Sequence, residues 1–243
     1  MTRNLDNESR DNNFRDYTYG IDGIVRDFLL CRIEKFISRN SKVLEIGSHD
    51  GFMTERLLRY FERVTVLEPV KHLAETVKLK FEEAVSVEIG TIVENVIKEK
   101  FDLVFLVHVL EHLANPIDEL VEIKRFLNHQ GLVVIMVPNA NALSRIIAVE
   151  MGLIPNVECV TEGERLQGHQ RTYTMNTLQS HSESAGYQVI EKGGILLKPL
   201  ANFQMDLALS KEIITDSYIN ALNILSEKDF TYSSSIFVVL KSG

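Results

Sequence analysis

The sequence predicts an α/β fold with a doubly wound sheet that is mostly parallel and includes a late antiparallel strand. Short apolar runs, typical of buried strands, alternate with segments of helical spacing. One run, FDLVFLVHV at 101–109, is apolar almost throughout, as a parallel strand covered on both faces requires. The 243 residues, 45% of them hydrophobic, suffice for one such domain with a substantial core.

The first half of the chain supplies five of the expected strands. Apolar residues at helical spacing predict a covering helix at 21–37, ahead of the first strand. The strands follow at 43–46, 63–67, 85–89, 101–109 and 131–137. The helices expected between them are at 52–58, 71–80, 94–98 and 116–127. Because strands alternate with helices, right-handed crossovers should place a ligand beyond the carboxyl ends of the strands.

The second half departs from this alternation. An apolar helix at 141–151 is followed by an irregular stretch of mixed charge, and we expect residues 141–173 to form a lid over a ligand pocket. Helices at 174–185 and 206–225 and strands at 187–197 and 235–240 complete the fold. We assign residues 1–243 to a single domain, with 1–38 as an N-terminal segment and covering helix.

Composition and charge exclude several classes of protein. A net charge of -8 argues against a general nucleic-acid binder, because phosphate contacts require a basic face. Cys31 and Cys159 form no C-x-x-C pair and predict neither a disulfide framework nor a zinc site. No run is apolar enough to span a bilayer, and the polar start does not resemble a signal peptide. The expected location is the cytoplasm, and a homodimer is one of the states that the sequence allows.

The stretch KVLEIGSHDGFMTERL, at 42–57, predicts a strand, a tight turn and the start of a helix. Gly47 and Gly51 in the turn would let the backbone approach a bound molecule and adopt positive φ. A dinucleotide fingerprint counted from Gly47 would need glycines where His49 and Phe52 stand. The turn therefore predicts a ligand site, but not one for a nicotinamide dinucleotide.

Two acids accompany this turn. Glu45 stands at the end of the first strand, giving acidic-x-Gly-x-x-x-Gly, and Glu68 closes the next strand in VTVLEP. The pattern resembles the class I S-adenosylmethionine-dependent methyltransferases, whose fold is Rossmann-like, and the resemblance covers roughly residues 40–140. It implies S-adenosylmethionine as the cofactor, with Glu45 near its ammonium group. Glu68 would bind the ribose, because a carboxylate can accept both hydroxyl protons.

The resemblance also implies a set of cofactor contacts. The residues expected to bind the cofactor are Tyr19, Glu45, Gly47, Ser48, His49, Gly51, Phe52, Glu68, Pro69, Thr91, Ile92, His108, Val109 and His112. Thr91 or the backbone of Ile92 would meet adenine. Two positions depart from the family pattern, since His49 is commonly glycine and the residue after the third strand is commonly acidic. Tyr19 has a plain packing role as its alternative.

The motif HVLEHLANP, at the end of the fourth strand, is a second point of resemblance. It implies that His108 and Val109 lie along the methionine part of the cofactor and that His112 closes the site. His108 and His112 are four residues apart and would face one way on a helical turn. A metal site would need a third ligand nearby, and the H-E-x-x-H spacing is absent, so no metal is expected.

The segment GHQRTYT, at 168–174, is a third point of resemblance, typical of small-molecule members of the family. If the segment is extended, His169, Arg171 and Tyr173 project to one side. His169 is then the expected catalytic base, if the acceptor needs one, and a structural salt-bridged strand is the alternative. The residues expected to bind the acceptor are Arg145, Arg171, Tyr173, Lys198 and Asn202.

Together these features predict a methyltransferase that acts on a small polar metabolite, at an oxygen in preference to a nitrogen. Arg145, Arg171 and Lys198 favour a phosphorylated, phosphonate or sugar-containing acceptor. Two alternatives stay open: a nicotinamide-dependent oxidoreductase, which the broken glycine spacing disfavours, and a noncatalytic module that binds S-adenosylmethionine. The expected partner is a small-molecule acceptor, with no nucleic acid and no membrane.

Overall fold

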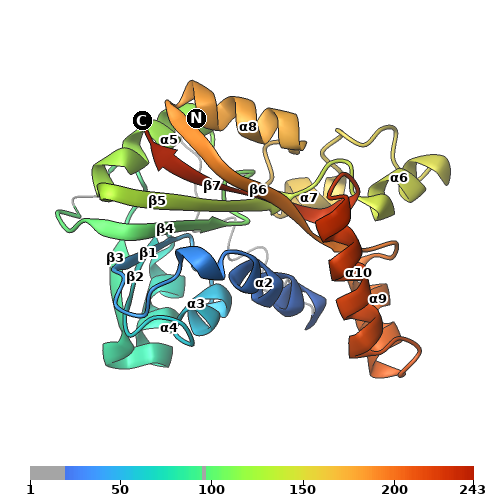
Figure 1. The fold of residues 1–243 in the computed structure, drawn as a ribbon, viewed down its shortest axis with the longest axis horizontal. Helices are drawn as coiled ribbons and strands as arrows, with labels where there is room; N and C mark the ends of the chain where they lie inside the picture. Colours follow the sequence, from blue (N-terminus) through green and yellow to red (C-terminus); the bar gives the residue numbers. More distant parts are fainter. Residues whose placement is uncertain (1–19, 95–96) are drawn as a thin grey trace.

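The computed structural model describes residues 20–94 and 97–243. Within them, seven strands form one sheet in the order β3-β2-β1-β4-β5-β7-β6 (Figure 1). The strands are β1 Val43–Ile46, β2 Val64–Glu68, β3 Val85–Ile89, β4 Phe101–Val107, β5 Leu127–Pro138, β6 Tyr187–Leu197 and β7 Ser233–Ser242. The first five strands are parallel, and β7 runs antiparallel to both β5 and β6. The expected α/β fold class and the late antiparallel strand are confirmed.

Helices cover both faces of the sheet (Figure 1). They are α2 Gly20–Arg32, α3 Phe52–Leu57, α4 Lys71–Phe81, α5 Pro116–Ile123, α6 Leu143–Glu150, α7 Glu162–Leu166, α8 Met175–Ser184, α9 Asn202–Ser210 and α10 Asp216–Lys228, with 3-10 turns at Glu34–Phe36, Glu82–Ala84 and Lys124–Phe126. Side chains of α2, α3 and α4 pack into the core on one face, and those of α5 and α8 pack on the other. None of the helices in the described ranges has the length and apolar character needed to cross a bilayer.

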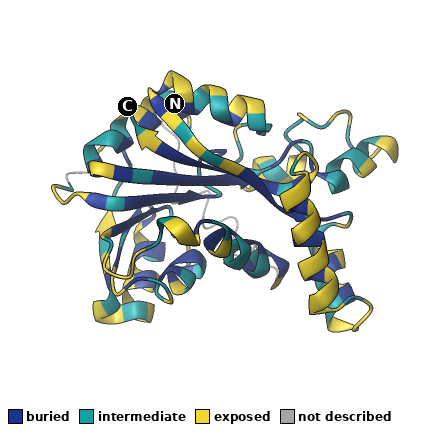
Figure 2. Ribbon diagram, viewed as in Figure 1, coloured by how far each residue is buried: buried dark blue, intermediate teal, exposed yellow. Residues whose placement is uncertain are grey.

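β4 shows why an apolar run is needed at this place in the sequence. Leu103, Phe105 and Val107 pack on the side of α2 and α3, whereas Val104 and Leu106 pack on the side of α5. All five are buried, as are most residues of the central strands in Figure 2. Each fully buried side chain of this kind contributes about 1.5–3 kcal/mol. The sheet is therefore a rigid frame for whatever lies at its carboxyl edge.

The C-terminal helical region differs from the expectation. The helix expected at 206–225 is two helices, α9 and α10, separated by a turn in which Glu212 adopts a φ of +56°. The hydroxyl of Thr215 accepts a hydrogen bond from the amide of Tyr218 and so starts α10 as a separate helix. No glycine or proline stands at 211–215, so the sequence carried no strong signal for the break.

Three other boundaries also differ. The stretch expected to be irregular contains α7, which begins with a capping box between Thr161 and Glu164. β4 ends at Val107, because His108 adopts a φ of +58°. The helix expected at 94–98 falls partly on 95–96, outside the described residues, and no helix is present at 97–98. Tyr19 also lies outside the described residues.

The N-terminal end of α2 is bound to α9 by hydrogen bonds. The carboxylate of Asp206 accepts hydrogen bonds from the amides of Gly20, at 2.7 Å, and Ile21, at 2.8 Å. Asn202 donates a further hydrogen bond of 2.8 Å to the carboxylate of Asp22. The two bonds to Asp206 satisfy backbone amides that have no partner within α2. The negative charge of Asp206 is also favourable at this end of the helix dipole.

Replacing Asp206 by Ala should therefore lower the free energy of unfolding by about 1–2 kcal/mol, because α2 loses its capping carboxylate. Asp206→Asn keeps one acceptor oxygen and should lose less. Chemical unfolding followed by circular dichroism measures both variants. Equal stability of Asp206→Ala and the wild type would mean that α2 does not depend on this contact.

Candidate functional site

The turn between β1 and α3 forms the centre of the candidate site, at the carboxyl edge of the sheet. Gly47 and Gly51 adopt φ values of +73° and +84°. A Cβ on Gly47 would lie 2.8 Å from a methyl group of Val109, and one on Gly51 would lie 2.5 Å from the ring of Phe81. Both glycines are therefore required by the packing of the chain itself, in addition to any approach of a ligand.

His49 lies between these glycines and adopts a φ of +52°. This left-handed conformation explains why glycine is common at this position in the resembling enzymes. The His49 side chain is exposed, and its Nδ1 lies 3.6 Å from the carboxylate of Asp50, which raises the pKa of His49. Asp50 also accepts a hydrogen bond from the amide of Phe52, so the turn leads directly into α3.

Glu68 connects the end of β2 to this turn. One carboxylate oxygen accepts from the amide of His49 at 2.9 Å and from the hydroxyl of Ser48 at 3.5 Å, and the other accepts from the amide of Val70 at 3.0 Å. The side chain is 3% exposed, and burial raises the pKa of Glu68 above its ordinary value despite these donors. The oxygen that bonds Val70 keeps a second lone pair, so the residue fits a role in accepting a hydrogen bond from a ribose hydroxyl. Its removal would also weaken the turn.

Glu45 is buried behind the same turn. Its carboxylate accepts a hydrogen bond of 2.6 Å from the hydroxyl of Thr54. Burial raises the pKa of Glu45 from its ordinary 4.5 to about 7, and the negative charge of Glu68 adds to the effect. A cationic group bound nearby would favour the ionised form. The predicted contact with an ammonium group fits this environment and stays a prediction.

Arg26 on α2 is a candidate binding residue that the sequence reasoning missed. The positive charge of its guanidinium favours the ionised forms of Glu45 and Glu111. The guanidinium carbon lies 5.1 Å from the ring centre of Phe52. One NH group donates to the carbonyl of Asp22, whereas the buried Nε–H has no hydrogen-bond partner. A buried unpaired donor is costly, so this group is suited to an anionic ligand. In the sequence, the sign that could have indicated this role was an arginine within the apolar stripe of the predicted helix.

The other predicted cofactor residues lie around this centre. Phe52 packs between Arg26 and Arg56, whose guanidinium is 4.1 Å from the centre of the ring. Pro69 directly follows Glu68 after the end of β2. Thr91 bonds to Glu94, so its hydroxyl is engaged locally. Ile92 is buried in the core, and its carbonyl accepts from Arg125.

Three histidines and one glutamate gather at the end of β4. His108 Nε2 lies 3.3 Å from the hydroxyl of Ser235, and the rings of His112 and His169 meet edge to face at 4.6 Å. Burial lowers the pKa of His108 well below its ordinary value, with Arg26 and the other histidines adding to the effect. Burial also lowers the pKa of His169. Both shifts favour the neutral imidazole, and the much lowered pKa makes buried His108 a poor proton acceptor.

Glu111 belongs to this group and was also missed. It is 1% exposed, and neither carboxylate oxygen has a hydrogen-bond partner. Burial raises the pKa of Glu111 to about 8. Ligand atoms of Glu111, His112 and His169 all lie within 4.8 Å of one another. The sequence paired His108 with His112 and offered no third ligand, whereas the structure groups His112 with Glu111 and His169, because the insertion brings His169 back to the end of β4.

The two arginines expected to bind the acceptor have structural contacts. Arg145 on α6 donates to the carbonyls of Val157, at 3.0 Å, and Cys159, at 2.5 Å, and pairs with Glu164. Arg171 donates to the carbonyls of residues 113 and 114 after β4. Both guanidinium groups therefore organise the chain, one within the insertion and one between the insertion and the β4–α5 loop. A role for either in holding an anion stays a prediction.

The remaining predicted acceptor residues are also engaged. Tyr173 is 1% exposed and packs in the core, with its hydroxyl 3.2 Å from Nδ1 of His181. Its hydroxyl is therefore engaged with α8, and a contact with the acceptor stays a prediction. Lys198 donates to Asn202, which in turn donates to Asp22 on α2. Burial lowers the pKa of Lys198 to about 8.

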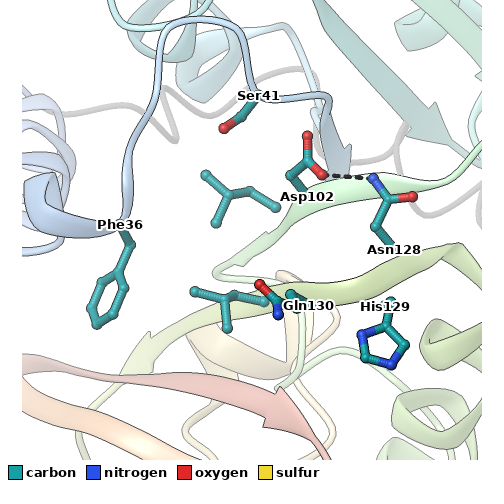
Figure 3. A pocket seen from close by; sticks show the side chains of 8 residues that line it. Phe36, Ser41, Asp102, Asn128, His129 and Gln130 are labelled. Carbon is teal, nitrogen blue, oxygen red and sulfur yellow. Dashed lines mark hydrogen bonds between the residues drawn. The ribbon is translucent and has the colours of Figure 1, made fainter.

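An open hollow at the opposite edge of the sheet is unrelated to this site. It is lined by Phe36, Ser41, Asp102, Leu103, Asn128, His129, Gln130 and Leu132 (Figure 3). Most of these residues belong to β4 and the first half of β5, Phe36 and Ser41 precede β1, and Asn128 donates a hydrogen bond to Asp102. Ligands of parallel α/β sheets bind at the carboxyl ends, so we assign no function to the hollow.

Sequence comparison identifies the family. A profile of a methyltransferase domain matches residues 18–192, which is more than half of the chain. This match confirms the resemblance to the class I S-adenosylmethionine-dependent methyltransferases. No curated protein sequence matches the chain significantly.

Solved structures of similar fold include several methyltransferases. The N-methyltransferase NodS from Bradyrhizobium japonicum WM9, in complex with S-adenosyl-L-homocysteine, matches with a TM-score of 0.62 at 13% identity, covering 99% of each chain. An S-adenosylmethionine-dependent methyltransferase from Mesorhizobium loti gives a TM-score of 0.62 at 12% identity, over 91% of this chain and 100% of that one. A methyltransferase from Archaeoglobus fulgidus that depends on S-adenosylmethionine gives a TM-score of 0.58 at 16% identity, over 90% of this chain and 94% of that one. At such identities the likeness concerns the fold.

Replacing Glu45 by Gln should stabilise the ligand-free protein at alkaline pH. The folded state holds the Glu45 proton up to a pKa of about 7, whereas the ordinary value is 4.5. The stabilising contribution of this carboxyl is complete below 4.5 and is lost as the pH rises through 7. The advantage of the variant in free energy of unfolding should therefore grow by up to about 3 kcal/mol from acid to alkaline pH.

Urea unfolding across this pH range measures the difference. The exposed Glu83→Gln serves as the control and should show no such trend. If the difference in free energy of unfolding between Glu45→Gln and the wild type stayed constant with pH, the raised pKa of buried Glu45 would be contradicted.

Proposed function

The chain belongs to the methyltransferase-domain family, and from this premise we propose that it methylates a hydroxyl oxygen of a small polar metabolite, with a nitrogen as the second choice. The family places it among enzymes rather than noncatalytic modules, and among methyltransferases rather than nicotinamide-dependent oxidoreductases. One observation carries the proposal. The glycine turn after β1 and the histidine group after β4 lie on neighbouring strands and touch, since Val109 packs against Gly47.

The first part of the proposal concerns the cofactor. S-adenosylmethionine, when bound, supplies a methyl group activated by a positively charged sulfur. Glu68 would accept a ribose hydroxyl proton on the oxygen that bonds Val70, and a second one in place of the long 3.5 Å bond from Ser48, while Glu45 would face the ammonium group. Arg26 would bind the carboxylate, since its Nε–H is buried without a partner. Together these residues match the two charges of the amino-acid end and the hydroxyls of the ribose.

The second part concerns the acceptor. A hydroxyl must lose its proton during methyl transfer, and neutral His169 at the edge of the insertion is suited to take it. Arg145 and Arg171 already donate to carbonyl groups, which weakens the case for a phosphorylated or phosphonate acceptor. A neutral hydroxylated molecule such as a sugar derivative fits better. We propose that residues 141–173 cover it, because Gln170 and Arg171 bond to the chain after β4.

Replacing Arg26 by Met should weaken binding of S-adenosylhomocysteine by about tenfold to a hundredfold, because a charged hydrogen bond to the carboxylate is lost. Binding of methylthioadenosine, which has no amino-acid end, should change little. Calorimetric titration of both ligands makes the comparison, with the exposed Arg59→Met as the control. An equal loss for both ligands would exclude a specific contact with the carboxylate.

Replacing His169 by Ala should lower turnover by about 10²- to 10⁴-fold while affinity for S-adenosylhomocysteine is retained, because the group that accepts the hydroxyl proton is removed. Transfer of a labelled methyl group from S-adenosylmethionine to a panel of hydroxylated metabolites measures turnover. The exposed His129→Ala is the matched control. Full turnover by His169→Ala would assign this role to another residue.

A further inference from the structure

We propose that Glu111, His112 and His169 bind a divalent transition-metal cation, such as Mn²⁺, Fe²⁺ or Zn²⁺, beside the acceptor position. The three side chains come from two segments far apart in sequence, the end of β4 and the end of the insertion. The site itself is independent of the proposed function. Only the role of the ion in methyl transfer depends on it.

The geometry brings three suitable ligands together. Their ligand atoms lie within 4.8 Å of one another, and bound ligands about 2.0–2.2 Å from a metal lie roughly 3–4 Å apart. Small side-chain rotations would therefore close the site. The backbone is already in register, because the amide of Gln170 donates to the carbonyl of Glu111 at 2.9 Å and the amide of His169 donates to that of Glu164 at 2.9 Å.

Glu111 supplies the second, independent observation. Its carboxylate is 1% exposed, and both oxygens lack a hydrogen-bond partner. A buried carboxylate without partners is strongly unfavourable, and buried charges are normally paired or coordinate metals. Arg26 attracts the charge of Glu111 but donates no hydrogen bond to it. A bound cation would satisfy both oxygens at once.

The donor set indicates the class of metal. Two imidazoles and one carboxylate suit Mn²⁺, Fe²⁺ or Zn²⁺, whereas Ca²⁺ and Mg²⁺ prefer oxygen ligands alone. Three protein ligands also leave coordination positions open. This arrangement is typical of a site that binds a substrate rather than one that only stabilises a fold.

If the proposed function holds, the ion would act as a Lewis acid on the acceptor hydroxyl. The hydroxyl proton would leave to solvent, the bond from oxygen to the methyl carbon would form, and the bond from sulfur to that carbon would break. The products are the methylated acceptor and S-adenosylhomocysteine. His169 would then act as a ligand of the ion, and its removal would lower turnover by that route.

Metal titration of the chelator-treated protein tests the site directly. Calorimetry with Mn²⁺ and with Zn²⁺ should give one saturable site in the wild type and in the His129→Ala control. The variants His112→Ala and His169→Ala should bind roughly a hundredfold more weakly or not at all. Absence of saturable binding, or equal binding by all four proteins, would overturn the proposal.

A second measurement covers the case in which a histidine variant does not fold. Glu111→Gln removes one of the proposed ligands and should abolish the rise in unfolding temperature that Mn²⁺ produces in the wild type. A Mn²⁺-induced rise that persists in Glu111→Gln would exclude Glu111 as a ligand and overturn the site as proposed.

Titration with S-adenosylhomocysteine separates this proposal from the proposed function. Binding of S-adenosylhomocysteine without saturable metal binding would overturn the metal site and leave the function intact. Metal binding that depends on His112, without binding of S-adenosylhomocysteine, would support the metal site and count against the function.

Discussion

The candidate site depends on one buried carboxylate. Glu68 ends β2, and its two oxygens hold the amides of His49 and Val70 and the hydroxyl of Ser48. The turn after β1 contains three residues with positive φ, and such a backbone persists only where its surroundings support it. Glu68 provides that support from the neighbouring strand. The same group that would bind the ribose thus also keeps the turn in shape.

The charges around this turn form a connected group. Half-buried Arg26 from α2 interacts electrostatically with Glu45 behind the turn and with Glu111 after β4, and both carboxyl groups are buried. Their hydrogen bonding is incomplete, since the Nε–H of Arg26 and both oxygens of Glu111 lack partners. Native structures rarely leave such groups unsatisfied without a functional reason. We therefore regard α2 as part of the site and not only as a cover for the sheet.

The insertion contributes to the site through its end rather than its beginning. Arg145 ties α6 to the following loop and to Glu164 of α7, which gives the insertion a structure of its own. Arg171 and Gln170 then attach its last residues to the chain after β4. Because these attachments directly follow His169, the ring of His169 is brought against His112. The contacts of both arginines are thus architectural.

The sequence by itself determined the order of strands and helices, the glycine turn and the acid that closes β2. These features are local, since strand periodicity, turn glycines and strand-end positions depend on residues close together in the chain. Only the tertiary structure decided which distant groups meet. The structural contacts of Arg145 and Arg171, the burial of Tyr173 and the meeting of Arg26, Glu111 and His169 all depend on packing between segments separated in sequence. Hydrophobic spacing indicates which face of a segment is buried, but it carries no information about which charged group lies opposite.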